Sequence, residues 1–364
     1  MSLSGIEALA REPDLELCCF VAASNQKLIG KLTELKSRLS HVSIVELAFS
    51  SRRFQGVRSR FEKGRIREVA RLLRDSQAQA LLVLQGDIEL SSIGVLAGKA
   101  IGIPTVSYIP VPHTLATMKA KLGSLRDPFN RWLFNKPDAF ITISEGMRGL
   151  LQDRGARQVI EVVFNGFVAS KTEKRDRHAS RKTLGLPQDC RLVAMVGRVE
   201  YKQKRQDFLL RTFAEHREQF ADARLLFVGS GPDAKDLMRQ TRDLGLDAEV
   251  FFLEWTDGLS DVYSAIDLLV LPSRFEGVPL VMLEAMSASV PIVGCSRDGM
   301  KEFLPSEWLF EPGNRAACAK TIASLLTGDP SALVVENKKR SLELFSLERF
   351  EAAFVRSTRK LGNL

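Results

Sequence analysis

Residues 273–286, which read Ser-Arg-Phe-Glu-Gly-Val-Pro-Leu-Val-Met-Leu-Glu-Ala-Met, decide the fold of this chain. They follow an apolar, strand-like run at residues 267–271, pass through a loop with glycine and proline, and enter a helix-forming run at residues 280–288. In an open α/β sheet, a loop of this kind lies at the carboxyl end of its strand, where ligands bind. The N–H groups at the start of the helix favour an anion there. The stretch therefore predicts a strand–loop–helix unit with an anion-binding loop.

Two carboxylates frame this loop and are candidates for hydrogen bonds to a ligand. Glu276 lies in the loop, and Glu284 lies in the expected helix, with seven residues between them. A pair of sugar hydroxyls could donate hydrogen bonds to the two oxygens of Glu284. Acidic side chains are also favoured at helix starts for electrostatic reasons alone. The pair by itself therefore leaves a binding role and a solvated role open.

The flanking residues favour the binding role. The string FEGVPLVMLEAMSASVPIV, residues 275–293, closely resembles the E-x7-E segment of GT-B glycosyltransferases of family four. The resemblance implies that Glu276 meets the hydroxyls of the donor sugar and that Glu284 meets the ribose of the nucleoside. It also places the loop between them against the diphosphate: Gly277, Val278, Pro279 and Leu280. Pro279 has no N–H group and can only shape the loop.

A second motif follows the strand expected at residues 191–196. Gly197 at the strand end lets the backbone turn closely, and converging Lys and Arg side chains can neutralise a diphosphate. The string VGRVEYKQKRQD, residues 196–207, resembles the donor-phosphate motif of the same family. Arg198 matches directly, and Lys204 matches because it precedes the Gln-Asp pair, with Lys202 as the alternative in register. A solvated basic loop is the alternative interpretation of the whole motif.

Two further segments resemble the nucleoside-binding parts of the family. Gly229 opens a Gly-Ser-Gly-Pro loop after the strand expected at residues 224–228. Trp255 and Thr256 close a segment whose counterpart in the family contacts the nucleobase, so both are expected to bind the donor. The identity of the base is left open between uridine and guanosine diphosphate sugars.

The first half of the chain supplies two acceptor-side candidates. Gly5 lies in a segment that resembles the family's glycine turn, although the strand that precedes this turn in the family is missing from the sequence. His113 lies in a loop where a histidine of the family faces the donor sugar, so the resemblance implies a catalytic role for it. A loop histidine without a catalytic part is equally compatible with the sequence.

Apolar runs that alternate with helical patterns predict an α/β protein, and its length suits two domains. In the first half, strands are expected at residues 15–21, 42–49, 80–84, 105–109, 139–143 and 159–164. The resemblance implies the GT-B architecture, with two Rossmann-like domains, a cleft between them and a C-terminal helix that crosses back. We expect an N-terminal domain at residues 1–168, a linker at 169–190, a nucleotide-sugar domain at 191–341 and the crossing helix at 342–364.

Composition and charge restrict the setting in which the protein works. Five cysteines without a C-x-x-C pair, no secretory signal and no apolar run of membrane-spanning length favour the cytoplasm. Residues 52–74 carry nine basic and two acidic side chains and read as an amphipathic helix. This segment and residues 118–136 predict contact with an anionic membrane surface, here the inner face of the plasma membrane. A charged helix packed on the sheet is the alternative interpretation, and no signature of a nucleic-acid-binding fold is present.

Taken together, these residues predict a retaining glycosyltransferase. It would move a sugar from a nucleotide-diphosphate donor to a hydroxyl of a lipid-linked or polysaccharide precursor. Arg198, Lys204 and the helix start would stabilise the leaving phosphate without a cofactor or metal, since the chain has no Asp-x-Asp pair. His113 and Glu276 would support the sugar. A catalytically impaired GT-B subunit, an epimerase and a phosphorylase are the alternatives that the sequence leaves open.

Overall fold

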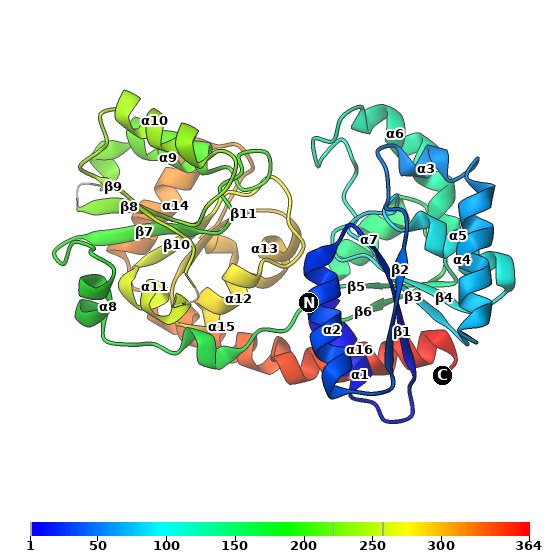
Figure 1. Ribbon diagram of the computed structural model, residues 1–364. Helices are drawn as coiled ribbons and strands as arrows, with labels where there is room; N and C mark the ends of the chain where they lie inside the picture. The colour runs from blue at the N-terminus through cyan, green and yellow to red at the C-terminus, as the bar shows by residue number, and fades with distance from the viewer. Residues whose placement is uncertain (1, 221, 257) are drawn as a thin grey trace. The chain divides into compact units, whose positions relative to one another are not determined.

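The computed structural model describes residues 2–220, 222–256 and 258–364 (Figure 1). The chain divides into two compact units. Unit 1 comprises Met1–Gly166 and Glu348–Leu364, and unit 2 comprises Phe167–Leu347. Within the described residues, no helix combines the length and the apolar character that crossing a bilayer requires.

Unit 1 is built around parallel strands with helices between them. Its strands are β1 Leu17–Ala22, β2 Val42–Leu47, β3 Leu81–Leu84, β4 Thr105–Tyr108, β5 Ala139–Thr142 and β6 Val159–Val162. Its helices are α1 Ser2–Ala10, α2 Gln26–Arg38, α3 Gln55–Arg58, α4 Lys63–Asp75, α5 Ser92–Ile101, α6 Gly123–Asn130, η1 Arg131–Asn135, α7 Glu145–Asp153 and α16 Leu347–Gly362. In the described part of the unit, β1 pairs with β2, and β3 to β6 form a parallel sheet in sequence order.

Unit 2 contains a parallel sheet whose strand order is β12-β11-β10-β7-β8-β9. Its strands are β7 Arg191–Val196, β8 Ala223–Val228, β9 Val250–Leu253, β10 Leu268–Leu271, β11 Ile292–Cys295 and β12 Leu309–Phe310. Its helices are η2 Ala169–Thr172, α8 Arg177–Thr183, α9 Gln206–Glu215, η3 Arg217–Phe220, α10 Ala234–Asp243, α11 Leu259–Ala265, α12 Leu280–Ser287, α13 Asp298–Phe303, η4 Ser306–Trp308, α14 Arg315–Thr327 and α15 Ser331–Leu344.

The expected α/β fold and its strands are confirmed, with ends that shift by a few residues. These segments form strands because their apolar residues are nearly continuous, as in Leu-Leu-Val-Leu of β10. Such runs suit a parallel sheet that helices cover on both faces. In unit 2, α9, α10 and α14 cover one face and α11 and α12 cover the other (Figure 1). Every residue of β10 and β11 is buried. The order of the sheet changes direction at β7 and β10, so the loops after these strands meet at a site where open α/β sheets bind ligands.

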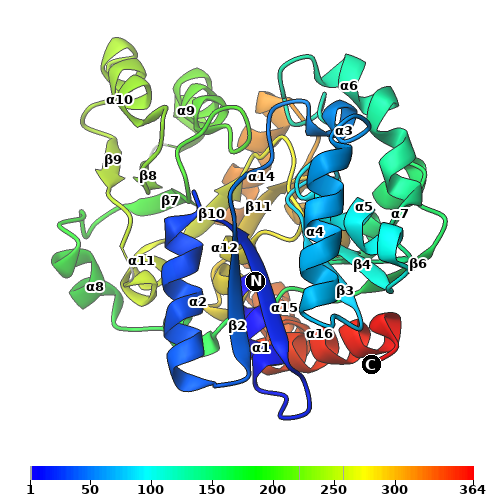
Figure 2. The same ribbon diagram turned by 45° about the vertical axis from the view of Figure 1, so that its right-hand side comes forward.

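The last helix belongs to unit 1, where α16 lies beside α1 (Figures 1 and 2). Gly5 lies inside α1, and a Cβ atom at this position would stand 2.6 Å from the Phe354 ring of α16. The expected glycine turn is therefore wrong, because Gly5 allows two helices to pack closely. Its small surface is covered by an aromatic ring, which argues against a role in acceptor binding.

The segment expected as a linker, residues 169–190, is instead folded into unit 2. It contains η2 and α8, and the side chain of Arg181 in α8 is fully buried. The Arg181 guanidinium lies 2.9 Å from the carboxylate of Asp267, and it donates hydrogen bonds to four backbone carbonyls. The expectation of a linker is wrong because Arg181 is anchored in the interior of unit 2 by Asp267.

The amphipathic segment at residues 52–74 also differs from its expected role. In α4, Val69 and Leu73 are buried in a core cluster of unit 1, and Ile66 packs against the same cluster. The apolar face of α4 therefore lies on the protein interior, and its arginines form the outer face. The alternative interpretation, a charged helix packed on the sheet, is correct for α4.

Replacing Arg181 by methionine is expected to lower the free energy of unfolding of unit 2 by about 3–5 kcal/mol, because Asp267 and four carbonyls lose a buried partner. The matched variant Arg177→Met also removes an ion pair with Asp267, but the Arg177 side chain is 42% exposed. Its loss should cost about 1 kcal/mol or less. Urea unfolding followed by the fluorescence of Trp255 and Trp308, which both lie in unit 2, measures the difference. Equal losses in the two variants would contradict this account.

Candidate functional site

Two glycine turns at the carboxyl edge of the unit-2 sheet are packed directly against each other. Gly197 follows β7 and Gly229 follows β8, and both adopt positive φ angles, of 137° and 132°. A Cβ atom on Gly229 would collide with the carbonyl oxygen of Gly197, and one on Gly231 would collide with that of Val199. Because these turns carry no side chains at their contact, their backbones can approach closely. Glycine is required here for space and for its backbone angle.

A cavity of about 620 Å³ opens beside these turns. Its lining includes Arg198, Trp255 and the Ser230–Pro232 loop. The Arg198 side chain is 67% exposed, and half of Trp255 is accessible. An exposed guanidinium and a half-exposed indole next to a backbone turn suit a planar, anionic ligand. Of the expected donor-binding residues, Arg198, Trp255 and the Gly229 loop are thus brought together.

Lys204 meets Glu276 on the other side of the Gly197 turn. The Lys204 Nζ lies 2.6 Å from Glu276 Oε1, and the two side chains are 19% and 8% exposed. Gln203 also donates a hydrogen bond to Glu276, at 3.4 Å. Lys202, the alternative in register, is exposed. The two motifs of the sequence therefore meet through Lys204 and Glu276, which lie 72 residues apart.

The start of α13 fixes the loop that carries Glu276 through two hydrogen bonds. The Glu276 N–H donates to Asp298 Oδ2 at 2.9 Å, and the Gly299 N–H donates to the Gly277 carbonyl at 2.9 Å. A Cβ atom on Gly299 would stand 2.5 Å from that same carbonyl oxygen. Asp298 and Gly299 were not among the expected site residues. They fix the backbone of residues 276–278, and the only sequence signal for them is the Asp-Gly pair after β11.

Glu284 is oriented by a buried tyrosine. The Tyr263 hydroxyl donates to Glu284 Oε2 at 2.8 Å. Burial, together with the charge of Glu284, raises the pKa of Tyr263 well above its usual value. The tyrosine therefore remains a neutral donor that fixes the position of the Glu284 carboxylate. The sequence showed Tyr263 only as part of a packed helix.

The start of α12 supplies backbone donors next to this loop. Val278 and Pro279 are buried, whereas Leu280 is 37% exposed. Pro279 caps the helix without a side-chain hydrogen bond, so the cap leaves the first N–H groups to other acceptors. Binding of an anion at this helix start stays a prediction.

A group of arginines adds positive charge at the same edge of the sheet. Burial lowers the pKa of the Arg274 guanidinium, and the nearby cations Arg205 and Arg297 lower it further, with Asp207 opposing them. Several guanidinium groups close enough to repel one another raise the local potential for an anionic ligand. Thr256, the remaining donor-binding candidate, accepts a hydrogen bond from the Gly258 N–H at 3.0 Å.

Most of the chain matches two families of known proteins. Residues 37–166 match the family described as "Glycosyl transferase 4-like domain", and residues 190–328 match the one described as "Glycosyl transferases group 1". Both matches describe glycosyl transferases, and together they cover more than half of the chain, so the chain belongs to the glycosyltransferases that these two models describe. The E-x7-E segment and the Arg198–Lys204 motif both lie within the second match.

Two curated glycosyltransferases are similar to this chain along most of its length. The D-inositol 3-phosphate glycosyltransferase of Rhodococcus opacus is 31% identical over 291 residues, which cover 73% of this chain and 64% of the relative. The 2-deoxystreptamine glucosyltransferase of Streptomyces kanamyceticus is 27% identical over 286 residues, which cover 74% and 73%. The chain therefore spans less than two thirds of the first of these relatives.

Solved glycosyltransferase structures share the fold. The Anabaena HepE protein, solved in complex with UDP, has a TM-score of 0.72 at 18% identity and covers 96% of this chain and 100% of its own. Sucrose-phosphate synthase from Thermosynechococcus elongatus has a TM-score of 0.72 at 16% identity, with coverage of 95% and 99%. The expected GT-B fold, with two Rossmann-like domains, is confirmed.

In unit 1, His113 lies in the loop after β4 and is buried. Arg154, which the sequence did not suggest, holds this loop: its Nη1 donates to the carbonyls of Pro112 at 3.2 Å and His113 at 2.5 Å. Its Nη2 lies 2.8 Å from Asp127, whose carboxylate accepts the N–H groups of the next loop residues. Burial lowers the pKa of Arg154. The backbone around His113 is thus fixed by a buried ion pair.

The substitution Gly229→Ala is expected to lower the free energy of unfolding of unit 2 by about 2–4 kcal/mol, because it adds a steric collision to a strained backbone angle. Gly245 is the matched control, since its φ of 66° is also positive but nothing lies near its missing side chain. Gly245→Ala should cost about 1 kcal/mol. Urea unfolding of both variants separates the two contributions, and a Gly229→Ala variant as stable as Gly245→Ala would show that the turns can separate freely.

Proposed function

We propose that this protein is a retaining glycosyltransferase that uses a nucleotide-diphosphate sugar as its donor. Two observations carry the proposal: the ion pair between Lys204 and Glu276, and the cavity lined by Arg198 and Trp255 in the loops after the neighbouring strands. A cation, a carboxylate, a helix start and an open aromatic face lie along one edge of the sheet. The cation and the helix start suit a diphosphate, the carboxylate suits the hydroxyls of a sugar, and the aromatic face suits a nucleobase.

In the reaction, the bond between the anomeric carbon and the β-phosphate oxygen breaks while the acceptor oxygen bonds to that carbon. The acceptor approaches on the face that the phosphate leaves, so the configuration is retained. The leaving oxygen takes the proton of the acceptor hydroxyl. Arg198, Lys204 and the N–H groups at the start of α12 stabilise the negative charge that develops on the diphosphate, without a cofactor or metal.

The carboxylates position the donor. Glu276 accepts hydrogen bonds from the sugar hydroxyls, and Glu284, whose carboxylate Tyr263 holds in place, accepts them from the ribose. When the diphosphate enters, Lys204 exchanges the Glu276 carboxylate for phosphate, and Glu276 gains hydroxyl donors in return. Each charged group therefore stays paired throughout binding. We retain His113 as a candidate contact of the donor sugar, and we assign no nucleophile.

The names of similar proteins bear on the donor and the acceptor separately. The relatives are named for transfer to an inositol phosphate and to an aminocyclitol, and HepE was solved with UDP. We therefore expect a UDP- or GDP-linked sugar as donor. For the acceptor, we keep a hydroxyl of a lipid-linked or polysaccharide precursor, which the enzyme meets in the cytoplasm at an anionic membrane surface.

A panel of UDP, GDP, and their sugar conjugates tests the donor. A ligand present at about 100 times its dissociation constant adds about 2.7 kcal/mol to the stability of the unit that binds it. At least one member of the panel should raise the unfolding temperature, and the gain should persist in excess EDTA. If no nucleotide shifts the transition of unit 2, the proposed donor class is wrong.

Removal of the cations tests their part in catalysis. Arg198→Ala and Lys204→Ala should each lower kcat by about 10²–10³-fold, the usual loss for a preorganised group that stabilises developing charge. Lys202→Ala is the matched control, because Lys202 is an exposed lysine of the same loop. Its activity should remain within about twofold of the wild type, in keeping with the small effects of exposed substitutions. A larger loss of kcat in Lys202→Ala than in Lys204→Ala would show that Lys202, and not Lys204, is the lysine of the donor-phosphate motif.

A further inference from the structure

Helix α6 of unit 1 exposes apolar side chains and buries polar ones, which is the reverse of a helix packed on a core. Leu122 at its N-cap and Leu125 and Phe129 within it are 53%, 63% and 58% exposed. Asn130 is fully buried, and the Arg126 side chain is only 12% exposed. A helix packed on a core normally turns its apolar stripe inward and its polar residues outward. In α6, the spacing of 122, 125 and 129 places an apolar stripe on the outside.

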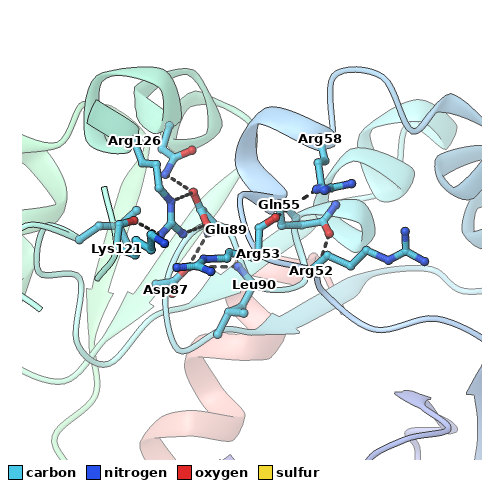
Figure 3. Close-up of polar contacts among 12 residues, drawn as sticks. Arg52, Arg53, Gln55, Arg58, Asp87, Glu89, Leu90, Lys121 and Arg126 are labelled. Atoms are coloured by element: carbon cyan, nitrogen blue, oxygen red, sulfur yellow. Dashed lines mark hydrogen bonds and ion pairs between the residues drawn. The ribbon is translucent and has the colours of Figure 1, made fainter. Parts of the chain in front are cut away.

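Buried polar contacts hold α6 in this orientation (Figure 3). Glu89 is 3% exposed and accepts a hydrogen bond from Asn130 Nδ2 at 2.7 Å. Arg126 forms an ion pair with the same carboxylate, and its guanidinium lies 4.9 Å from the centre of the Phe54 ring. Rotation of α6 to bury its leucines would leave Glu89 buried without its cation, which is strongly unfavourable. The outward apolar stripe is therefore fixed by the fold.

The turn between α3 and α4 contacts the segment that follows α6. Phe61 in this turn is 80% exposed. Its neighbour Arg60 lies 5.0 Å from the centre of the Trp132 ring, which follows α6 in the chain. Arg60 and Trp132 also line a cavity of about 410 Å³, together with Ser59, Lys63, Ile66 and Leu96. The two segments are thus side by side and expose aromatic and aliphatic groups together.

The same two segments also expose many basic residues. Within residues 51–63 and 118–136, all of which the structure describes, the exposed basic side chains are Arg52, Arg53, Arg58, Arg60, Lys63, Lys119, Lys121 and Arg131. The two acids of these segments are already paired, Glu62 with Arg65 at 2.9 Å and Asp127 with Arg154 at 2.8 Å. The two segments therefore expose large apolar groups together with an excess of positive charge.

We propose that this surface, formed by residues 51–63 and 118–136, docks the protein on an anionic lipid bilayer. Leu122, Leu125, Phe129 and Phe61 enter the boundary between headgroups and acyl chains, and the lysines and arginines of the two segments meet lipid phosphates. Self-association through the same surface would bring two cationic surfaces together, which disfavours a second copy as the occupant. The inference deepens the proposed function by naming the surface that meets the membrane, and it requires no transferase activity to be tested.

Co-sedimentation with vesicles tests the docking. The wild-type protein should bind phosphatidylcholine–phosphatidylglycerol vesicles at low salt, and it should bind pure phosphatidylcholine vesicles much more weakly. The double variant Leu125→Gln/Phe129→Gln should lower the partition coefficient by about tenfold or more, because it removes two inserted apolar side chains. The charge variant Lys119→Gln/Lys121→Gln should bind more weakly, with a smaller dependence on salt.

Val335→Gln is the matched control, since Val335 is 68% exposed but lies in α15 of unit 2. It should bind vesicles as the wild type does. Unchanged binding by the Leu125→Gln/Phe129→Gln variant, or no binding by the wild type, would overturn the proposal. So would a dimer, detected by light scattering, that this double variant abolishes. A urea-unfolding transition like that of the wild type, followed by circular dichroism for every variant, checks that the fold is intact. This control does not depend on nucleotide binding, so the docking test is separate from that of the donor.

Discussion

The backbone contact between Gly197 and Gly229 is the constraint on which the candidate donor site depends. Parallel strands β7 and β8 pair in register up to Val196 and Val228, so the chain leaves both strands at the same level. Without side chains at the contact, the two turns can close onto each other. The side chains that follow them are then directed along one edge of the sheet. A cavity of about 620 Å³ with Arg198 at its margin is the consequence.

The ion pair between Lys204 and Glu276 has more to do with binding than with stability. Both side chains are largely withdrawn from water, so the cost of desolvation offsets much of their attraction. A ligand that offers Lys204 a phosphate and Glu276 a set of hydroxyls replaces one set of partners by another at little net cost. The support from Asp298 and Gly299 keeps the Glu276 loop in place during such an exchange, because it acts through the backbone.

The parts of the site that the sequence revealed are those encoded in continuous strings. Lys204 and Glu276 lie in motifs at strand ends, and parallel topology brings strand ends together. Tyr263 and Asp298 were missed because their roles arise from tertiary contacts that no local pattern records. The segment around Arg181 was misread for a related reason: a run of charged residues looks solvated unless its buried partner, Asp267, is known.

The amphipathic helices of unit 1 show a similar limit of prediction from the sequence. A hydrophobic period of 3.6 residues reveals that a helix has an apolar face, but not whether that face meets a core or a membrane. In α4, the face containing Val69 and Leu73 meets the core. In α6, the deciding residue is Glu89, which lies 37 and 41 residues before its partners Arg126 and Asn130. Because this buried carboxylate requires polar partners, it turns the leucines of α6 outward, and the positive charge of residues 51–63 and 118–136 gives that apolar surface an anionic bilayer as its natural counterpart.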